Sequence, residues 1–185
     1  MTTSVNFAAF GIYLPKYNGS IFELMSAPIS AYEIVIGYAG AAASKSILIS
    51  ILILLISTIF VDFYIKHPLL MLLLLAITSI TFSLFGFIIG IWATNFEKLQ
   101  LIPLIIITPL VFLGGSFYSI SMLPELWQLV TKFNPIFYII NGFRWSFFGT
   151  SDIDLFTSLS LIVIFLFICL AIIGLIFKTG YRIKG

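Results

Sequence analysis

The stretch LFTSLSLIVIFLFICLAIIGLIF, from Leu155 to Phe177, determines the fold class, because its 23 residues include no charged side chain. A helix needs about 20 consecutive, mostly apolar residues to cross the ~30 Å hydrocarbon core of a bilayer. This stretch therefore predicts a membrane-spanning helix over residues 155–177.

Three further stretches have the same character. Pro68–Phe96 and Leu99–Pro124 carry no charge, and Ile34–Val61 is interrupted only by Lys45. The stem of Lys45 can extend toward the membrane surface, or its ammonium group can face the interior of a helical bundle. We predict spans at 40–61, 70–94 and 99–117, in addition to 155–177.

The composition of the whole chain agrees with four spans. Of its 185 residues, 61% are hydrophobic and 9% are charged, whereas an average soluble domain is about 25% charged. So few polar residues cannot cover the surface of a soluble core, which excludes a soluble enzyme, a nucleic-acid-binding protein and a disordered protein. The predicted class is an all-α integral membrane protein.

The distribution of basic residues predicts the orientation, because cytoplasmic segments carry an excess of Lys and Arg. Four spans place both ends of the chain on the same side of the membrane. The basic residues on that side are Lys16, Lys45, Lys98, Lys178, Arg182 and Lys184, and those on the other side are Lys66, Lys132 and Arg144. We therefore expect both ends in the cytoplasm.

The N-terminal segment, residues 1–14, is predicted to be the end of a membrane-spanning helix. Its apolar part, Val5–Leu14, has ten residues and is too short to cross a bilayer. We expect that the helix begins upstream, so that the chain is a fragment or has a wrongly chosen start codon.

Residues 20–28 are predicted to form a short cytoplasmic helix. Ser20 and Glu23 have the spacing of a capping box. The apolar side chains that follow are Phe22, Leu24 and Met25, and Pro28 ends the segment. From spacing alone, an ordinary linker helix at the membrane surface is the favoured interpretation.

Residues 118–149 form the predicted outer segment. Gly114 and Gly115 break the preceding helix, and Pro124 opens a short helical pattern at an N1-like position. Asn134 and Pro135 provide an N-cap and N1 pair for a second pattern that ends before Gly149. The uncharged residues 133–143 are too few to span, which is typical of a re-entrant or interfacial helix.

The sequence contains no motif for catalysis or metal binding. It has no Walker A sequence, so this chain cannot hydrolyse a nucleotide by that route. The only histidine, His67, and the only cysteine, Cys169, stand alone, and the carboxylates are scattered outside the spans. We expect neither a metal site nor a catalytic site.

Two smaller features have alternative interpretations. Gly86 and Gly90 form a GxxxG pattern, which allows close helix packing; packing within the chain is favoured over a dimer contact. Arg144 is the only charge in a long apolar stretch, and a carboxylate or carbonyl partner at the membrane surface is favoured over contact with a substrate.

Two segments together resemble the permeases of type-2 ABC exporters, the ABC-2 family. Residues 123–144, LPELWQLVTKFNPIFYIINGFR, are similar to a family signature that follows a glycine break. The matching residues are Gly114, Gly115, Leu123, Pro124, Trp127, Asn134, Pro135, Tyr138 and Arg144. Residues 22–28, FELMSAP, followed by Gly37, are similar to the coupling-helix segment of the same family.

The resemblance implies partners and roles that spacing alone does not. Such permeases have six spans and act as homodimers with two cytoplasmic ABC ATPase subunits, which alone bind ATP and Mg. Residues 118–144 would form outer helices near the exit, and the chain would start where the second span of the family ends. The residues implied to contact the ATPase are Phe22, Glu23, Leu24, Met25 and Pro28.

The favoured hypothesis is therefore a permease subunit in the bacterial inner membrane. It would export an amphipathic, drug-like or lipid- or polysaccharide-linked substrate. The alternative is a membrane scaffold or a degenerate permease that does not transport. A membrane-embedded enzyme ranks third, because the clustered His, Cys or acidic residues of such a site are missing.

Overall fold

The computed structural model describes residues 1–61 and 64–180, without the side chain of Met25. Over this part of the chain every regular element is helical. The elements are α1 (Thr2–Tyr17), α2 (Ile21–Ser26), α3 (Ala31–Phe60), α4 (Pro68–Trp92), α5 (Phe96–Leu113), the 3-10 helix η1 (Ile120–Met122), α6 (Glu125–Lys132), α7 (Pro135–Phe148) and α8 (Leu155–Thr179).

Four of these helices, α3, α4, α5 and α8, are long and apolar enough to cross a membrane. Their apolar side chains remain largely exposed: Leu55, Ile59 and Leu104 each expose 60% or more of their area. Such faces are stable only against lipid or other protein. The prediction of an all-α integral membrane protein is confirmed.

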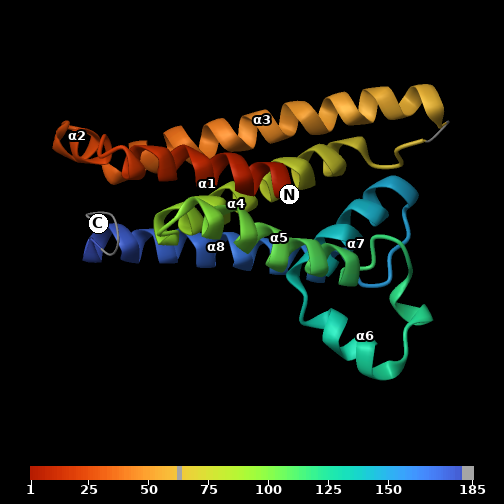
Figure 1. The fold of residues 1–185 in the computed structure, drawn as a ribbon. Helices are drawn as coiled ribbons and strands as arrows, with labels where there is room; N and C mark the ends of the chain where they lie inside the picture. The colour runs from red at the N-terminus through yellow and green to blue at the C-terminus, as the bar shows by residue number, and fades with distance from the viewer. Residues whose placement is uncertain (62–63, 181–185) are drawn as a thin grey trace.

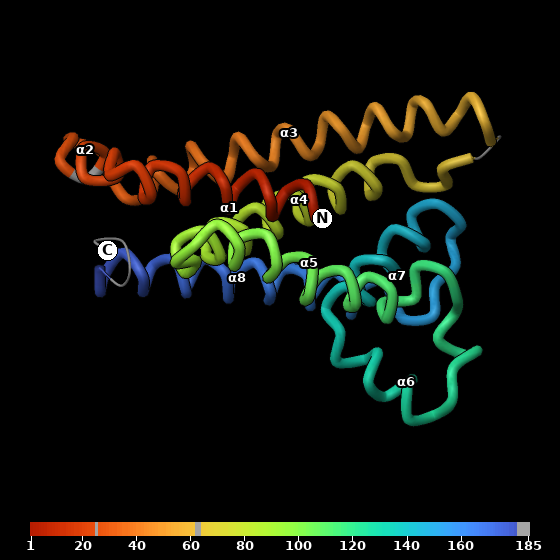
Figure 2. Tube along the Cα trace, in the orientation of Figure 1, coloured from red at the N-terminus to blue at the C-terminus, as the bar shows by residue number. Residues whose placement is uncertain are grey.

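Helix α4 forms the centre of the bundle. In its most apolar stretch 61% of the residues are buried, against 11% to 17% in the other three helices of spanning length. It packs against α1, α3, α7 and α8, and Figure 2 shows it between α3 on one side and α8 on the other. The fold therefore depends on α4 more than on any other described helix.

The closest helix contact joins α4 to α1 through Gly86 and Gly90. A Cβ atom added to Gly86 would lie 2.7 Å from the Cα of Val5, and one added to Gly90 would lie 3.0 Å from the Cα of Ala9. These distances are shorter than real Cβ contacts, so only glycine allows the two backbones to lie this close. The structure thus places the GxxxG pattern in a contact within the chain.

The two ends of the bundle differ in character (Figure 1). Helix α2 and the end of α8 lie at one end, called here the α2 end, whereas α6 and α7 lie toward the other, the α6 end. At the α2 end Lys16 donates from Nζ to the backbone oxygens of Ile91, at 2.6 Å, and Ala93, at 3.3 Å. This cation satisfies carbonyl groups that the end of α4 leaves free.

Several helix bounds differ from the expected ones, and the start of α3 differs most. The segment predicted at 40–61 belongs to a helix that begins nine residues earlier, at Ala31, where Ser30 and Glu33 form a complete capping box. The segment predicted at 99–117 ends at Leu113, because Gly114 is its C-cap and Gly115 has a φ of +81°. Pro124 precedes α6 as its N-cap instead of occupying N1.

The α1–α4 contact generates a stability prediction. We expect Gly86→Ala or Gly90→Ala to lower the free energy of unfolding in detergent by about 1–3 kcal/mol, because the new methyl group overlaps the backbone of α1. The matched control is Gly174→Ala in α8, where nothing lies within 4 Å of an added Cβ. Equal thermal midpoints for Gly86→Ala and Gly174→Ala would contradict the contact.

Candidate functional site

Helix α2 presents a small exposed surface that is anchored by one residue. Ile21 is buried in the core beside α3 and α4, with 6% of its area exposed. The next two residues point outward: Phe22 is 53% exposed and Glu23 is exposed as well. Leu24 is half-buried, Pro28 is exposed, and the side chain of Met25 lies outside the described part of the chain.

The capping box expected at Ser20 and Glu23 is wrong. The Ser20 side chain makes no capping hydrogen bond, because its backbone is in the α region, with φ −62° and ψ −13°. A serine caps a helix from an extended backbone, and that conformation occurs ten residues later at Ser30, with φ −74° and ψ 152°. Glu23 is therefore not engaged in a cap, and its carboxylate is available at the surface.

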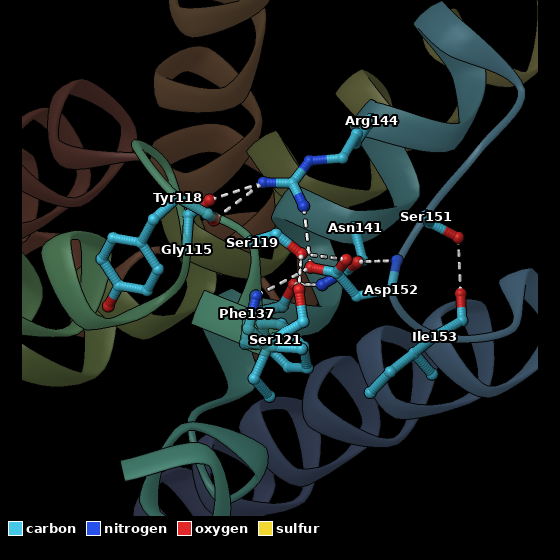
Figure 3. Close-up of polar contacts among 11 residues, drawn as sticks. Gly115, Tyr118, Ser119, Ser121, Phe137, Asn141, Arg144, Ser151, Asp152 and Ile153 are labelled. Carbon is cyan, nitrogen blue, oxygen red and sulfur yellow. Dashed lines mark hydrogen bonds and ion pairs between the residues drawn. The ribbon is translucent and has the colours of Figure 1, made fainter. Parts of the chain in front are cut away.

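At the α6 end, Arg144 joins three segments of the chain (Figure 3). Its Nη1 donates to the Oδ2 of Asp152 at 2.8 Å. Its Nη2 donates to the backbone oxygens of Gly115 at 2.7 Å and Tyr118 at 3.2 Å. Arg144 thus has both kinds of partner, a carboxylate and carbonyl groups, that the sequence favoured for it.

Asp152 is the centre of this cluster, although no motif in the sequence marks it as such. Besides Arg144, its carboxylate accepts hydrogen bonds from the Ser119 hydroxyl at 2.5 Å and from the backbone N–H of Ile120 at 3.1 Å. Burial raises the pKa of Asp152, but these hydrogen bonds and the charge of Arg144 outweigh burial, so the pKa lies below its ordinary value of 3.8. The carboxylate is therefore ionised and holds η1 against α7.

Two asparagines, Asn141 on α7 and Asn134 at its N-cap, complete the polar contacts at the α6 end. Asn141, 1% exposed, accepts a hydrogen bond at Oδ1 from the backbone N–H of Asp152 at 2.9 Å. Asn134 accepts from the backbone N–H of Ile136 as the N-cap of α7, and its Nδ2 donates to the oxygen of Leu110 at 2.6 Å. The Leu110 carbonyl does not accept the hydrogen bond from the Gly114 N–H that would continue the helix, because this N–H donates to the carbonyl of Val111. The Leu110 carbonyl can therefore accept from Asn134. Asn134 thus joins the end of α5 to the start of α7.

The other signature residues lie around the short helix α6. Tyr138 donates its hydroxyl hydrogen to the carbonyl of Lys132 at the end of α6. Trp127 is 47% exposed, and four more apolar residues of this region, Leu126, Leu129, Val130 and Phe133, are exposed beside it. Leu123 and Pro124 connect η1 to α6, and Pro135 is the first residue of α7.

The glycine pair has a role in packing. Gly114 is buried, and a Cβ added there would lie 2.9 Å from Ile140 of α7. Gly115 adopts a positive φ, and its carbonyl accepts from Arg144. The break after α5 therefore brings the loop onto α7, where Arg144 and Asp152 hold it.

A further contact at the α6 end, between His67 and Trp145, was not predicted from the sequence. His67 stacks on Trp145 with ring centroids 4.4 Å apart and 12° between the planes. The backbone N–H groups of Lys66 and His67 donate to the oxygens of Phe147 and Ser146. The segment before α4 is thus joined to the end of α7, and no local pattern in the sequence indicates this pairing.

Two adjoining grooves run along the exposed face of α1. One, of about 420 Å³, is lined by Thr2, Thr3, Asn6, Phe7 and Phe10. The other, of about 310 Å³, lies between α1 and α5, with Asn6 on one side and Gln100 on the other. Both grooves combine aromatic or aliphatic side chains with uncharged polar groups, which is typical of sites for amphipathic molecules.

Nothing in the described part of the chain suggests a resident metal, since no three of its His, Cys, Asp or Glu side chains are grouped closely enough to hold an ion. Cys169 is a free, buried cysteine.

The Asp152 cluster predicts an acid-sensitive contribution to stability. A carboxylate with a lowered pKa stabilises the folded state fully above its ordinary pKa of 3.8, and this stabilisation is lost as the pH falls through the folded value. We expect Asp152→Asn to lower the free energy of unfolding by about 1 kcal/mol at pH 7, since the cluster is partly solvated. Thermal unfolding in detergent at pH 7 and pH 3 measures this difference.

The control is Asp154→Asn, since Asp154 caps α8 and asparagine is an equally good N-cap. The difference in free energy of unfolding between the wild type and Asp152→Asn should be smaller at pH 3 than at pH 7. A difference that stays constant between the two pH values would show that the Asp152 charge does not hold the cluster.

Comparison with known proteins adds to this geometry. The family profile described as "ABC-2 type transporter" matches residues 1–148. The inner membrane transport permease YadH of Escherichia coli strain K12 is 38% identical over 151 residues, which cover 82% of this chain and 59% of YadH. Nodulation protein J of Rhizobium leguminosarum bv. trifolii is 25% identical over 80 residues, covering 43% of this chain and 30% of that protein.

No solved structure gave a significant match. The aligned region covers 59% of YadH, so this chain spans less than two thirds of the length of that permease. The match to the family profile covers α1 to α7, including the α2 surface and Arg144, but not Asp152. From this match and from its four apolar helices of spanning length, the chain belongs to the ABC-2 type transporter family of membrane proteins.

Proposed function

We propose that this chain is the permease subunit of an ATP-driven exporter in a bacterial inner membrane, with ATP and Mg bound by a separate ABC ATPase. The observation that carries the proposal is the exposed α2 surface, Phe22 and Glu23, fixed to the bundle by the buried Ile21. An exposed phenylalanine beside an exposed carboxylate is suited to docking in a cleft of a soluble protein. The family membership supports an ATPase as that protein.

The connections of α2 explain how movement of the ATPase would reach the membrane. The helix lies between α1 and α3, which pack on each other and on α4. Since α1 and α4 touch backbone to backbone at Gly86 and Gly90, a displacement of α2 moves these helices as a unit. ATP binding to the ATPase has to stabilise one arrangement of the permease helices over the other by several kcal/mol, because a smaller difference leaves both arrangements populated.

The grooves on α1 and α5 support a position for the transport pathway. The side chains of Asn6 and Gln100 make no hydrogen bond to another described residue, although both belong to apolar helices. Polar side chains in such helices usually face a pathway or another helix. We further propose that two copies form a homodimer, in which their α1 and α5 faces enclose a path for an amphipathic substrate.

Export is proposed from the resemblance to ABC-2 exporters, and the proposed orientation places the entrance and the exit. The α2 end lies in the cytoplasm with the ATPase, and the α6 end lies outside, so that outer helices α6 and α7 border the exit. The exposed apolar residues of α6 are suited to the membrane surface, where tryptophan and other apolar side chains gather.

Cysteine labelling tests the orientation. Single cysteines replace Ser20 beside α2 and Thr150 after α7, both exposed, and the native Cys169, 1% exposed, serves as the unlabelled background. In intact spheroplasts a membrane-impermeant maleimide should modify Thr150→Cys at once and Ser20→Cys only after permeabilisation. Modification of Ser20→Cys in intact spheroplasts would overturn the orientation.

Coupling to the ATPase is tested with two matched double variants. The dipeptide Glu-Leu occurs on α2 as Glu23-Leu24 and on α6 as Glu125-Leu126. In the full-length protein with its ATPase, Glu23→Lys with Leu24→Asp should reduce permease-stimulated ATP hydrolysis about tenfold or more, because docking loses a charge and an apolar contact. Glu125→Lys with Leu126→Asp should leave it unchanged.

Unchanged stimulation in the α2 variant would overturn the coupling role. Permease that co-purifies with no ATPase at all would favour the alternative function, a membrane scaffold that does not transport.

A further inference from the structure

A groove of about 880 Å³ lies between α3 and α8, with α4 as its floor. Helices α3 and α8 lie on opposite sides of α4 (Figure 2) and form the two walls. The deeper lining is apolar and buried: Leu84 of α4 and Ile173 of α8 each expose 4% of their area. The rims are exposed, with 70% of Ile36 and 63% of Phe167 accessible. Such an open apolar groove is suited to an apolar occupant.

The groove covers about half of the membrane thickness, starting at the α2 end. Its lining runs from Ala31 to Gly40 on α3 and from Leu166 to Phe177 on α8, which is about 14 Å and about 17 Å of helix. Half of a ~30 Å hydrocarbon core is about 15 Å, whereas a spanning helix of about 20 residues is about 30 Å long. The length of the groove therefore fits an acyl chain of one leaflet better than a spanning helix.

Two glycines leave space along this length. Gly40 on α3 and Gly174 on α8 line the groove, and a Cβ added to either would meet no atom within 4 Å. Small residues on both walls allow a helix backbone or an acyl chain to approach closely. The short length of the groove favours the acyl chain.

A cation follows the groove at its α2 end. The lining residues Phe167, Ala171 and Gly174 have the four-three spacing of one helix face. Lys178 follows Gly174 by four residues and therefore continues this row, exposed in the last turn of α8. On the opposite wall Tyr32, 81% exposed, lies in the first turn of α3. Its hydroxyl group can donate a hydrogen bond.

The carboxylate of Glu33, next to Tyr32 in the sequence, is held in the capping box of α3. It accepts from the backbone N–H of Ser30 at 2.7 Å and from the Ser30 hydroxyl at 2.9 Å, and Glu33 is not among the residues that line the groove. Basic residues between helices at a membrane surface commonly bind lipid headgroups. An ammonium group and a phenol hydroxyl above an apolar groove thus match a phosphate above an acyl chain.

We infer that the groove between α3 and α8 binds an anionic phospholipid of the leaflet at the α2 end, with one acyl chain along the groove and the phosphate beside Lys178 and Tyr32. The phosphate accepts a charge-assisted hydrogen bond from Nζ of Lys178. The acyl chain fills the space above Leu84 and supports α3 and α8 on either side of α4. This lipid site goes beyond the proposed function and does not depend on it.

The acyl-chain part of the site is tested by filling the groove. Native mass spectrometry of the full-length protein measures its affinities for anionic dioleoylphosphatidylglycerol and for dioleoylphosphatidylcholine, which has no net charge. Gly40→Phe should weaken the binding of both lipids about tenfold or more, because the ring occupies the space of the acyl chain. The matched control is Gly37→Phe, since Gly37 has the same open surroundings on α3 but does not line the groove.

The charge of the site is tested with Lys178→Gln. This variant should bind dioleoylphosphatidylglycerol about fivefold more weakly and dioleoylphosphatidylcholine within about twofold of the wild type, because only the anionic lipid loses a net attraction. Lys98→Gln serves as the control, since Lys98 is an exposed basic residue in the first turn of α5. Its affinity for both lipids should equal that of the wild type.

Thermal unfolding separates the lipid from other occupants of the groove. Equal midpoints for Gly40→Phe and Gly37→Phe, with weaker lipid binding only in Gly40→Phe, would support the site. A helix of the full-length protein or of a second copy in the groove would give Gly40→Phe a lower midpoint and unchanged lipid affinity, which would overturn it. Equal affinity of Lys178→Gln and the wild type for dioleoylphosphatidylglycerol would overturn it as well. Binding is measured without ATP or an ATPase, so that failure of the transport proposal leaves this test unaffected.

Discussion

The backbone contact between α1 and α4 at Gly86 and Gly90 is the constraint on which the rest of the structure depends. It buries α4, and α3, α7 and α8 then pack around α4. It also fixes the level of α1 relative to α4, so that Lys16 reaches the last carbonyls of α4. A larger side chain at either glycine would separate the helices and shift both ends of the molecule.

The two ends of the bundle are held together by different interactions. The α2 end carries a six-residue helix with one buried anchor and an exposed Phe-Glu pair. The α6 end is joined by polar contacts instead: Asp152 and Arg144 join η1 and the loop after α5 to α7, while Asn134 joins the end of α5 to its start. Apolar packing along the bundle and directional hydrogen bonds at the α6 end are consistent with the proposed permease, which would transmit a movement from one side of the membrane to the other.

The parts of this structure that follow from local sequence could be predicted. The spans expected at 70–94 and 155–177 lie within two residues of α4 and α8, since long uncharged stretches indicate helices of spanning length. The start of α3 could not be predicted, because Ser20 and Ser30 are each followed by a glutamate three residues later. Only the backbone conformation, which depends on the neighbouring turn, shows that Ser30 is the cap. The role of Asp152 was also missed, since its partners Ser119 and Ile120 lie more than 30 residues away in the sequence.

The most direct test is an electron cryomicroscopy structure of the full-length protein with the proposed ATPase subunits in a lipid nanodisc. We expect α1 to remain packed on α4 at Gly86 and Gly90, Phe22 and Glu23 to contact the ATPase, and the Arg144–Asp152 pair to lie on the opposite side of the membrane. A structure in which α1 has separated from α4, or in which α2 points away from the ATPase, would contradict this expectation.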